Sequence, residues 1–241
     1  MRRPLSALAI LTLAACSPAK EESKKTEAAE ASPAVSTATP AEIAPTKTDA
    51  PKGAYTLDKA HASLDFRVNH IGFSNYTARF SNFDALLQFD PENPAASSIS
   101  ATVDARSLLL PTPPAGFLDE LLGDKWLNAV QFGQMTFKST KIELTGANTA
   151  KITGDFTMRG QTLPVTLDAT FNGGYAGNAY EPQARIGFSA RGSLQRSAFG
   201  ISIGLPPPGT KMGVSENVDI IIEAEFNGPP LKDATPVAPG K

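Results

Sequence analysis

The sequence has few of the side chains on which most catalytic and metal sites depend. Its 241 residues include one cysteine and two histidines. A single cysteine cannot form a disulfide within the chain, and neither His61 nor His70 belongs to a His-x-Glu or His-x3-His pattern. The chain also lacks a Gly-x-Ser-x-Gly elbow, a phosphate-binding loop and a dinucleotide fingerprint. These absences argue against a metal centre and against the common hydrolases and nucleotide-dependent enzymes.

Excess charge of one sign and long hydrophobic runs are missing as well. The formal net charge is −2, and no run of Lys and Arg occurs beyond the first residues. This balance argues against nucleic acid as a partner and against docking of the whole chain to anionic lipid by charge. The apolar stretch at residues 5–15, broken by Ser6 and Thr12, is too short to span a bilayer. Because it follows Met1-Arg-Arg, it is typical of an export signal.

The only cysteine follows this apolar stretch. Leu13-Ala14-Ala15-Cys16 resembles the lipobox of bacterial lipoproteins, in which the signal is cut before the cysteine and the cysteine then carries the lipid. We therefore expect a signal peptide at residues 1–15 and lipidation at Cys16, which would anchor the protein to a membrane. Ser17, rather than an aspartate, favours the outer membrane. The expected location is the periplasmic side, anchored to the outer membrane.

Composition divides the remaining chain into three parts. Residues 16–53 consist of Ala, Pro, Thr, Ser, Lys and Glu with almost no large apolar side chains, so they cannot bury enough surface to offset their ordering entropy. Residues 228–241 repeat proline and are expected to be a disordered tail. We predict a disordered tether at 16–53, one domain at 54–227 and the tail at 228–241.

Inside the domain, apolar and polar residues alternate with the two-residue period of a half-buried strand. The clearest example places Leu64, Phe66, Val68 and His70 on one face. A tight hairpin is expected at Gly160-Gln161, between two such segments. The eight predicted strands lie near residues 63–70, 76–89, 98–105, 134–144, 151–159, 163–171, 184–195 and 218–226.

Eight amphipathic antiparallel strands predict an all-β fold, an eight-stranded lipocalin-like barrel with one short helix at an end. Barrels of this size are either filled by side chains or hold one small ligand, and the pattern leaves both open. Thr112 is the predicted helix cap and Gly123 the predicted end. Trp126 would either plug this end of the barrel or contact a ligand. A membrane-spanning barrel is disfavoured, since one Trp and four Tyr cannot form two aromatic girdles.

A set of short motifs occurs in order along this domain. They are Tyr55-Thr-Leu-Asp with His61-Ala-Ser, Phe66-x-Val68-x-His70, Arg79-Phe80, Trp126 with Met135-Thr136-Phe137-Lys138-Ser139, Gly154-Asp155-Phe156-Thr157-Met158-Arg159-Gly160 with Pro164-Val165, and Arg196-Ser-Ala-Phe199-Gly200-Ile201. Together they resemble the YceI family over residues 55–226. The resemblance implies an extended barrel whose elongated apolar cavity holds a polyisoprenoid chain, such as a prenyl quinone or prenyl pyrophosphate. Gly133 and the segment 111–115 depart from the family pattern, and the second departure affects the expected head-group contacts.

The inward faces supply the expected ligand contacts. Arg196 would pair with a phosphate or polarise a quinone carbonyl, or would be a solvated arginine at the rim. His70 would be a buried core residue with a protein hydrogen-bond partner, which is the preferred interpretation, or a contact to the head group. The expected ligand-binding residues are Phe66, Val68, His70, Phe80, Phe156, Phe188, Arg196, Phe199 and Ile222.

These observations predict a periplasm-facing lipoprotein that binds or carries an isoprenoid lipid. No cofactor, metal or catalytic residue is expected, so the predicted class is a binding protein rather than an enzyme. Its predicted partners are the isoprenoid lipid and the membrane that holds the anchor, and a second copy of the chain in a homodimer is kept as a further partner. The alternatives are a stress-response structural protein with a filled barrel and, less favoured, a hydrolase.

Overall fold

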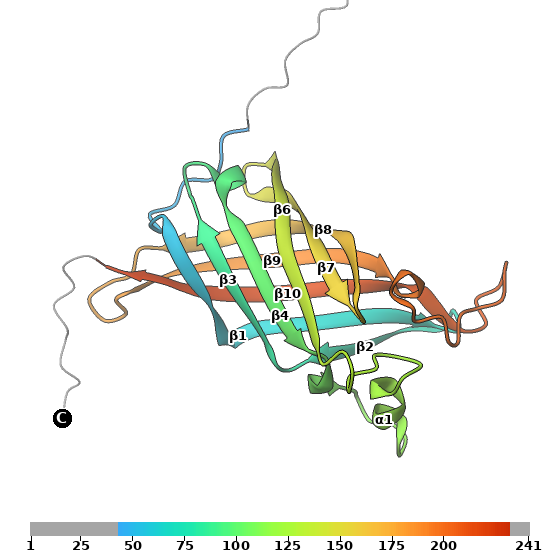
Figure 1. Ribbon diagram of the computed structural model, residues 1–241. Coiled ribbons are helices and arrows are strands. Elements are labelled where there is room, and N and C mark those ends of the chain that lie inside the picture. The colour runs from blue at the N-terminus through green and yellow to red at the C-terminus, as the bar shows by residue number, and fades with distance from the viewer. Residues whose placement is uncertain (1–42, 232–241) are drawn as a thin grey trace, which may run out of the picture. The chain divides into compact units, whose positions relative to one another are not determined.

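The computed structural model describes residues 43–231, so the predicted signal peptide, Cys16 and most of the predicted tether and tail lie outside the described residues. Ten antiparallel strands form one sheet in the order β10-β9-β8-β7-β6-β4-β3-β1-β2-β5, and β10 also pairs with β1 (Figure 1). All strands except β2 and β5 therefore form a closed ring, which confirms the predicted eight-stranded antiparallel barrel. The strands are β1 (Gly53–His70), β2 (Ser74–Phe80), β3 (Phe83–Phe89), β4 (Ser98–Asp104), β5 (Leu108–Leu109), β6 (Gln134–Gly146), β7 (Thr149–Met158), β8 (Gln161–Tyr175), β9 (Gln183–Gln195) and β10 (Val214–Pro230).

The long strand β1 closes the ring. One edge of β1 pairs with β10 along most of its 18 residues, whereas the other edge pairs with β3 at residues 53–56 and with β2 at residues 64–70. The segment 76–89, predicted as one strand, is therefore two strands that lie end to end beside β1. The break falls at Ser81 and Asn82, whose backbone groups bond to Ser107 and Asp104 instead.

The apolar faces predicted for β1, β4, β7, β8, β9 and β10 point into the barrel. Apolar residues of β3 and β6, for which no face was predicted, line the interior as well. One irregularity changes the period in β6. The pairing with β7 shifts between Ser139 and Lys141, so Phe137 before the shift and Ile142 after it both face inward. A bulge of this kind adds one residue to one strand and moves the following side chains to the other face.

The predicted tight hairpin joins β7 to β8. Met158 pairs with Gln161, which leaves Arg159 and Gly160 as the two turn residues, one position earlier than the dipeptide expected. Their φ angles are 52° and 74°, and a two-residue turn with both φ positive matches the right-handed twist of the strands that it joins. The Arg159 guanidinium donates to the backbone carbonyls of Asp124 (2.9 Å) and Trp126, and so holds the segment after the helix against the hairpin.

Two apolar clusters pack the two ends of the barrel. The first lies at the end where β1 begins, and burial there raises the pKa of Tyr55 to about 12 while its hydroxyl donates to Pro51 O at 2.7 Å. Its buried members are Ala50, Tyr55, Leu57, Ala85, Leu87, Phe89, Ala184, Ile186, Ala224 and Phe226. The second cluster consists of Ala105, Ala129, Met135, Met158, Phe199 and Ile201, with Trp126 packed against it.

The short helix α1 (Phe117–Leu122) is present at an end of the barrel, but Thr112 does not cap it. The N-cap is Gly116, and Thr112 has a φ of 45° outside the helix. The segment Pro113-Pro114 explains the difference, because a residue before proline is disfavoured in the helical region. Gly123 ends the helix as predicted. Within residues 43–231, no helix has both the length and the apolar character needed to cross a membrane.

The packed chain extends beyond the predicted domain bounds. Before β1, Thr46 N donates to Ala147 O at 2.7 Å, Ala50 is buried and Lys52 pairs with Asp90 at 2.6 Å. The end of the segment predicted as tether therefore packs on the barrel, and β10 continues to Pro230, into the predicted tail. The average composition of a segment does not predict this packing, because one small residue such as Ala50 can be buried in a segment that is otherwise polar.

Candidate cavity for an apolar ligand

An apolar cavity of about 570 Å³ occupies the interior of the barrel. Every ring strand contributes to its wall, together with β2, β5 and α1. Its volume lies within the roughly 300–1,000 Å³ that is usual for small-molecule sites. The interior of this barrel is therefore not completely filled by its own side chains.

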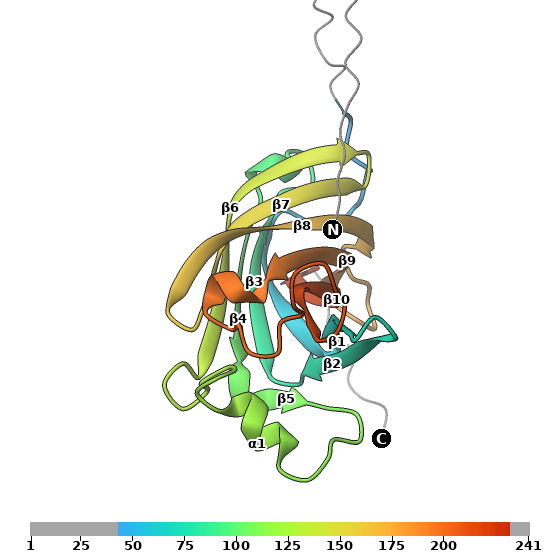
Figure 2. The ribbon, with the colours of Figure 1, turned by 90° about the vertical axis from the view of Figure 1, so that its right-hand side faces the viewer.

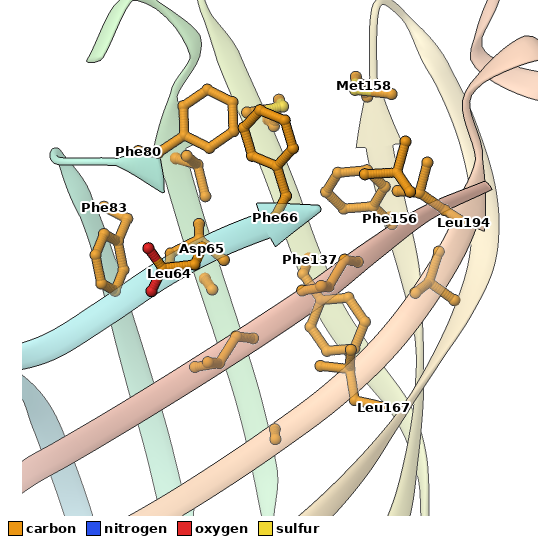
Figure 3. Close-up of a pocket in the computed structure, with 18 of the residues that line it drawn as sticks. Leu64, Asp65, Phe66, Phe80, Phe83, Phe137, Phe156, Met158, Leu167 and Leu194 are labelled. Atoms are coloured by element: carbon orange, nitrogen blue, oxygen red, sulfur yellow. The ribbon is translucent and has the colours of Figure 1, made fainter. Parts of the chain in front are cut away.

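Aromatic rings form much of the wall. Phe66 and Phe80 lie 5.6 Å apart between ring centroids, and Figure 3 shows Phe83, Phe137 and Phe156 from β3, β6 and β7 around the same space. At the end where β1 begins, the wall continues into stacked and edge-on rings of the first cluster, where Phe171 and Phe188 are 5.4 Å apart. Such surfaces bind apolar groups without a directional polar contact.

The structure brings together eight of the nine residues predicted to contact a ligand. Those that line the cavity are Phe66, Val68, His70, Phe80, Phe156, Phe188, Arg196 and Ile222. The exception is Phe199, which is only 2% exposed and packs in the second cluster with its ring 5.5 Å from that of Phe156. Phe199 belongs to the 3₁₀ helix Arg196–Phe199 rather than to a strand, so it supports the wall from behind.

His70 is not the buried core residue that its parity predicted. It is exposed, and its imidazole makes no hydrogen bond to any residue between 43 and 231. The β1–β10 pairing becomes irregular between Val68 and His70, and β1 ends there in a turn with Ile71 at a φ of 56°. Because His70 still lines the cavity, it marks a place where the cavity reaches the surface.

Arg196 is neither a solvated rim residue nor a free cation. It is 3% exposed, and its guanidinium donates to the carbonyls of Ser215, Ile201, Ile203 and Val214 at 2.8–3.0 Å. Burial lowers the pKa of Arg196 from its ordinary value, and Glu216 partly opposes this effect. Four of its five N–H groups are thus used to fix the loop between the 3₁₀ helix and β10.

Trp126 contacts both the Arg196 guanidinium and the second apolar cluster. The Arg196 guanidinium carbon is 5.3 Å from the centroid of the indole ring, a cation–π distance, and the ring also lines the cavity. The indole Nε1 is buried and has no hydrogen-bond partner among the described residues. Trp126 therefore both plugs this end and faces the ligand space, so the two predicted roles occur together.

Few ionisable groups face the cavity. Apart from His70 and Arg196 they are Tyr76, whose pKa is raised by burial, and Asp65, which pairs with Arg79 at 3.2 Å. This wall can hold an apolar molecule, whereas the described residues that line it bring together no nucleophile with a general base.

One carboxylate–histidine group elsewhere has the spacing of metal ligands. The ligand atoms of Asp58, His61 and Glu225 lie within 4.8 Å of one another. The Arg185 guanidinium, however, donates to Asp58 at 2.9 Å and to Glu225 at 2.8 Å. A cation already occupies this group, so it is better described as an ion-pair network that joins β1, β9 and β10.

Several wall residues were not predicted as ligand contacts. Tyr76, Phe83, Phe137 and Leu121 line the cavity beside the predicted set. Tyr76 shares the inward face of β2 with the predicted Phe80, whereas no residue of β3 or β6 was predicted as a contact. The period-two pattern would have found all three, because each lies on the apolar face of its strand. Leu121 comes from α1, and only the tertiary structure places it over the barrel's end.

The chain was compared with known proteins. The family model of the YceI-like domain matches residues 55–226. A UPF0312 protein of Vibrio cholerae is 35% identical over 173 residues, which cover 71% of this chain and 85% of that protein. A UPF0312 protein of Enterobacter sp. strain 638 is 36% identical over 173 residues, covering 71% of this chain and 84% of that protein.

Solved structures give the same answer for the fold. The crystal structure of Burkholderia cenocepacia BcnA is similar with a TM-score of 0.59 and 25% identity, over 70% of this chain and 98% of that one. The Campylobacter jejuni YceI protein is similar with a TM-score of 0.55 and 29% identity, over 73% of this chain and 98% of that one. The motifs, the closed ring of eight strands and these matches agree, and the chain belongs to the YceI family.

Proposed function

We propose that this protein binds and carries an isoprenoid lipid in the cavity of its barrel. The observation that supports the proposal most directly is a cavity of about 570 Å³ whose wall is almost entirely apolar. Such a wall matches a hydrocarbon tail and offers little to a polar metabolite, because desolvating unpaired polar groups costs free energy. The ligand class follows from the resemblance to the YceI family, and a prenyl quinone or prenyl pyrophosphate would fit it.

The tail supplies most of the expected affinity. Burial of apolar surface contributes roughly 25 cal/mol per Å², so a chain of several isoprene units can bind tightly without a charged contact. Arg196 is a weak candidate for a phosphate contact, since four of its N–H groups already bond to carbonyls. A neutral head group such as a quinone therefore suits this wall better than a pyrophosphate.

The remaining parts of the proposal concern location. Cys16 carries the lipid anchor, and the barrel faces the periplasm from the outer membrane. These features rest on the lipobox-like sequence before Cys16 and on Ser17. Formation of a homodimer stays a prediction, for which sedimentation velocity is the direct measurement.

The two alternatives have less support. A purely structural barrel would be expected to fill its interior, because protein cores are close-packed and a large empty cavity is destabilising. A hydrolase would need a nucleophile beside a base, and the ionisable groups on the wall are separated among Asp65, His70, Tyr76 and Arg196 without a hydrogen bond that links them.

The proposal predicts that protein purified from its host carries an isoprenoid lipid and that filling the cavity excludes it. Ala190 lines the cavity on β9, so Ala190→Phe places a ring in the ligand space. Organic extraction and mass spectrometry should find at least about tenfold less lipid per protein in this variant, the loss expected when one large contact is replaced by a clash.

The matched control is Ala54→Phe, which adds the same ring at an exposed position of β1. It should keep the lipid content of the original protein, and thermal unfolding should show that both variants remain folded. An extract without any isoprenoid lipid from the unsubstituted protein would refute the proposed function.

A further inference from the structure

Exposed apolar side chains gather at the end of the barrel where β1 turns into β2. Phe73 in this turn is 85% exposed, and Met212 and Ile203 in the loop before β10 are 65% and 39% exposed. We call these three residues the mouth patch. Scattered exposed apolar residues are ordinary in folded proteins, whereas a group of them on one surface marks an interaction site.

The turn and the loop form one surface. Ile71 N donates to Gly213 O at 2.8 Å, and the aliphatic carbons of Lys211 lie directly over Gly72. Figure 2 shows this loop, which runs from the 3₁₀ helix to β10, across the end of the barrel. The hydrogen bonds from Arg196 hold the loop in place from inside.

The mouth patch is continuous with the cavity. Phe73 N donates to His70 O at 3.0 Å, and Val214 follows the loop directly in the sequence. His70 and Val214 both line the cavity, and His70 is exposed. An apolar ligand that leaves the cavity beside His70 therefore meets the mouth patch first.

The charge of this surface differs from that of the whole chain. Residues 69–74 and 202–213 contain no carboxylate side chain, and their only lysine or arginine is Lys211. Apolar side chains next to a lysine are suited to the boundary between lipid headgroups and acyl chains, where the apolar groups insert and the ammonium contacts phosphate.

We infer that the mouth patch docks on the surface of a phospholipid bilayer, with Phe73 and Met212 inserted and Lys211 at the headgroup phosphates. This inference rests on the proposed function, because it explains how a lipid that is almost insoluble in water passes between a membrane and the cavity. The apolar rim gives the tail a continuous path from the acyl chains to the wall at His70 and Val214.

The test is sedimentation with vesicles of phosphatidylethanolamine and phosphatidylglycerol. Protein beginning at Ser17 is used for all variants, because it retains the closed ring and both apolar clusters but lacks Cys16. The double variant Phe73→Ser/Met212→Ser should bind at least about tenfold more weakly, since one fully inserted apolar side chain contributes about that factor. Lys211→Gln should lower the affinity for these vesicles roughly fivefold, and should change the affinity for vesicles of phosphatidylcholine alone only a little.

The matched control is Tyr180→Ser. Tyr180 is 90% exposed on the loop between β8 and β9, which lies at the other end of the barrel beside Leu231 (Figure 1). This variant should bind vesicles like the unsubstituted protein, and all variants should melt at similar temperatures. Unsubstituted protein that fails to bind vesicles, or a double variant that binds them equally well, would overturn the inference.

Two further readouts separate this inference from its alternatives. If the double variant instead abolishes self-association in sedimentation velocity while vesicle binding stays the same, the mouth patch covers a second copy and the inference is wrong. The lipid extracted from protein purified from its host is measured separately. Vesicle binding without any extracted isoprenoid lipid would reject the proposed function alone, and extracted lipid without vesicle binding would reject the mouth patch alone.

Discussion

At the scale of single residues, Arg196 shows how a charged side chain can serve structure in the wall of a binding cavity. An arginine near a cavity is usually considered first as a contact to an anionic group of the ligand. Here the planar guanidinium is buried and bonds to carbonyls on both sides of the loop before β10, while its face lies over Trp126. Its main effect is therefore to fix the loop that carries Ile203 and Met212 of the mouth patch.

We expect Arg196→Lys to lower the free energy of unfolding by about 2–4 kcal/mol, because one ammonium cannot reach all four carbonyls and buried acceptors are left unpaired. Urea unfolding measures the change, and hydrogen exchange should quicken first at Val214. Arg191→Lys, at an exposed position of the preceding strand β9, should change stability by no more than about 0.5 kcal/mol. Equal stability of the two variants would show that the carbonyl contacts contribute little.

At the scale of secondary structure, the pairing of β1 with β10 closes the barrel, and its far end depends on a close approach. Gly228 of β10 lies against the ring of Tyr55 of β1, so a Cβ atom at position 228 would overlap the ring. Tyr55 is fully buried and its hydroxyl is bonded to Pro51 O. The ring therefore cannot move aside without a loss of packing and of this hydrogen bond.

Gly228→Ala should consequently destabilise the protein by roughly 1–3 kcal/mol, the usual effect of overpacking a core. Thermal or urea unfolding is the measurement. Gly187→Ala on β9 is the matched control, because the nearest side-chain atom to its added Cβ is 3.8 Å away, an ordinary contact. If both substitutions have the same small effect, the end of the barrel can relax around position 228 and the packing argument does not hold.

At the scale of the whole molecule, the proposed function joins three features: a lipid anchor, a barrel and a cavity mouth. In the described residues, the chain enters the barrel at Gly53, at the end packed by the first apolar cluster, whereas the mouth patch lies at the other end. The strand β1, with 18 residues, spans at most about 60 Å between these ends. The chain between Cys16 and Thr46, where packing on the barrel begins, can span roughly 100 Å at full extension, so the mouth could face a membrane that holds the proposed anchor.

The anchor itself is open to a direct test. Cys16→Ser should leave the chain uncleaved by the lipoprotein pathway and remove its lipid-dependent attachment to the membrane. Intact-mass measurement and partition into detergent report both effects. Recovery of the unsubstituted protein from a soluble periplasmic extract without detergent would contradict lipidation at Cys16.

The sequence alone was sufficient for the barrel and for most of its wall. Alternation with period two depends only on the direction in which strand side chains point, so Phe66, Phe156 and Ile222 could be placed inside before any pairing was known. The turn at Gly160 was similarly local, because a glycine with positive φ is a property of a few adjacent residues. The YceI motifs likewise needed only their order along the chain.

The tertiary structure decided what happens where strands end. His70 has the inward parity of Val68, but the irregular pairing with β10 and the turn at Ile71 leave it exposed at the mouth. Arg196 is buried because carbonyls of the following loop and of the start of β10, up to 19 residues away in sequence, converge on it. Such positions depend on contacts between distant segments, and a local pattern of apolar and polar residues contains no information about which segments meet.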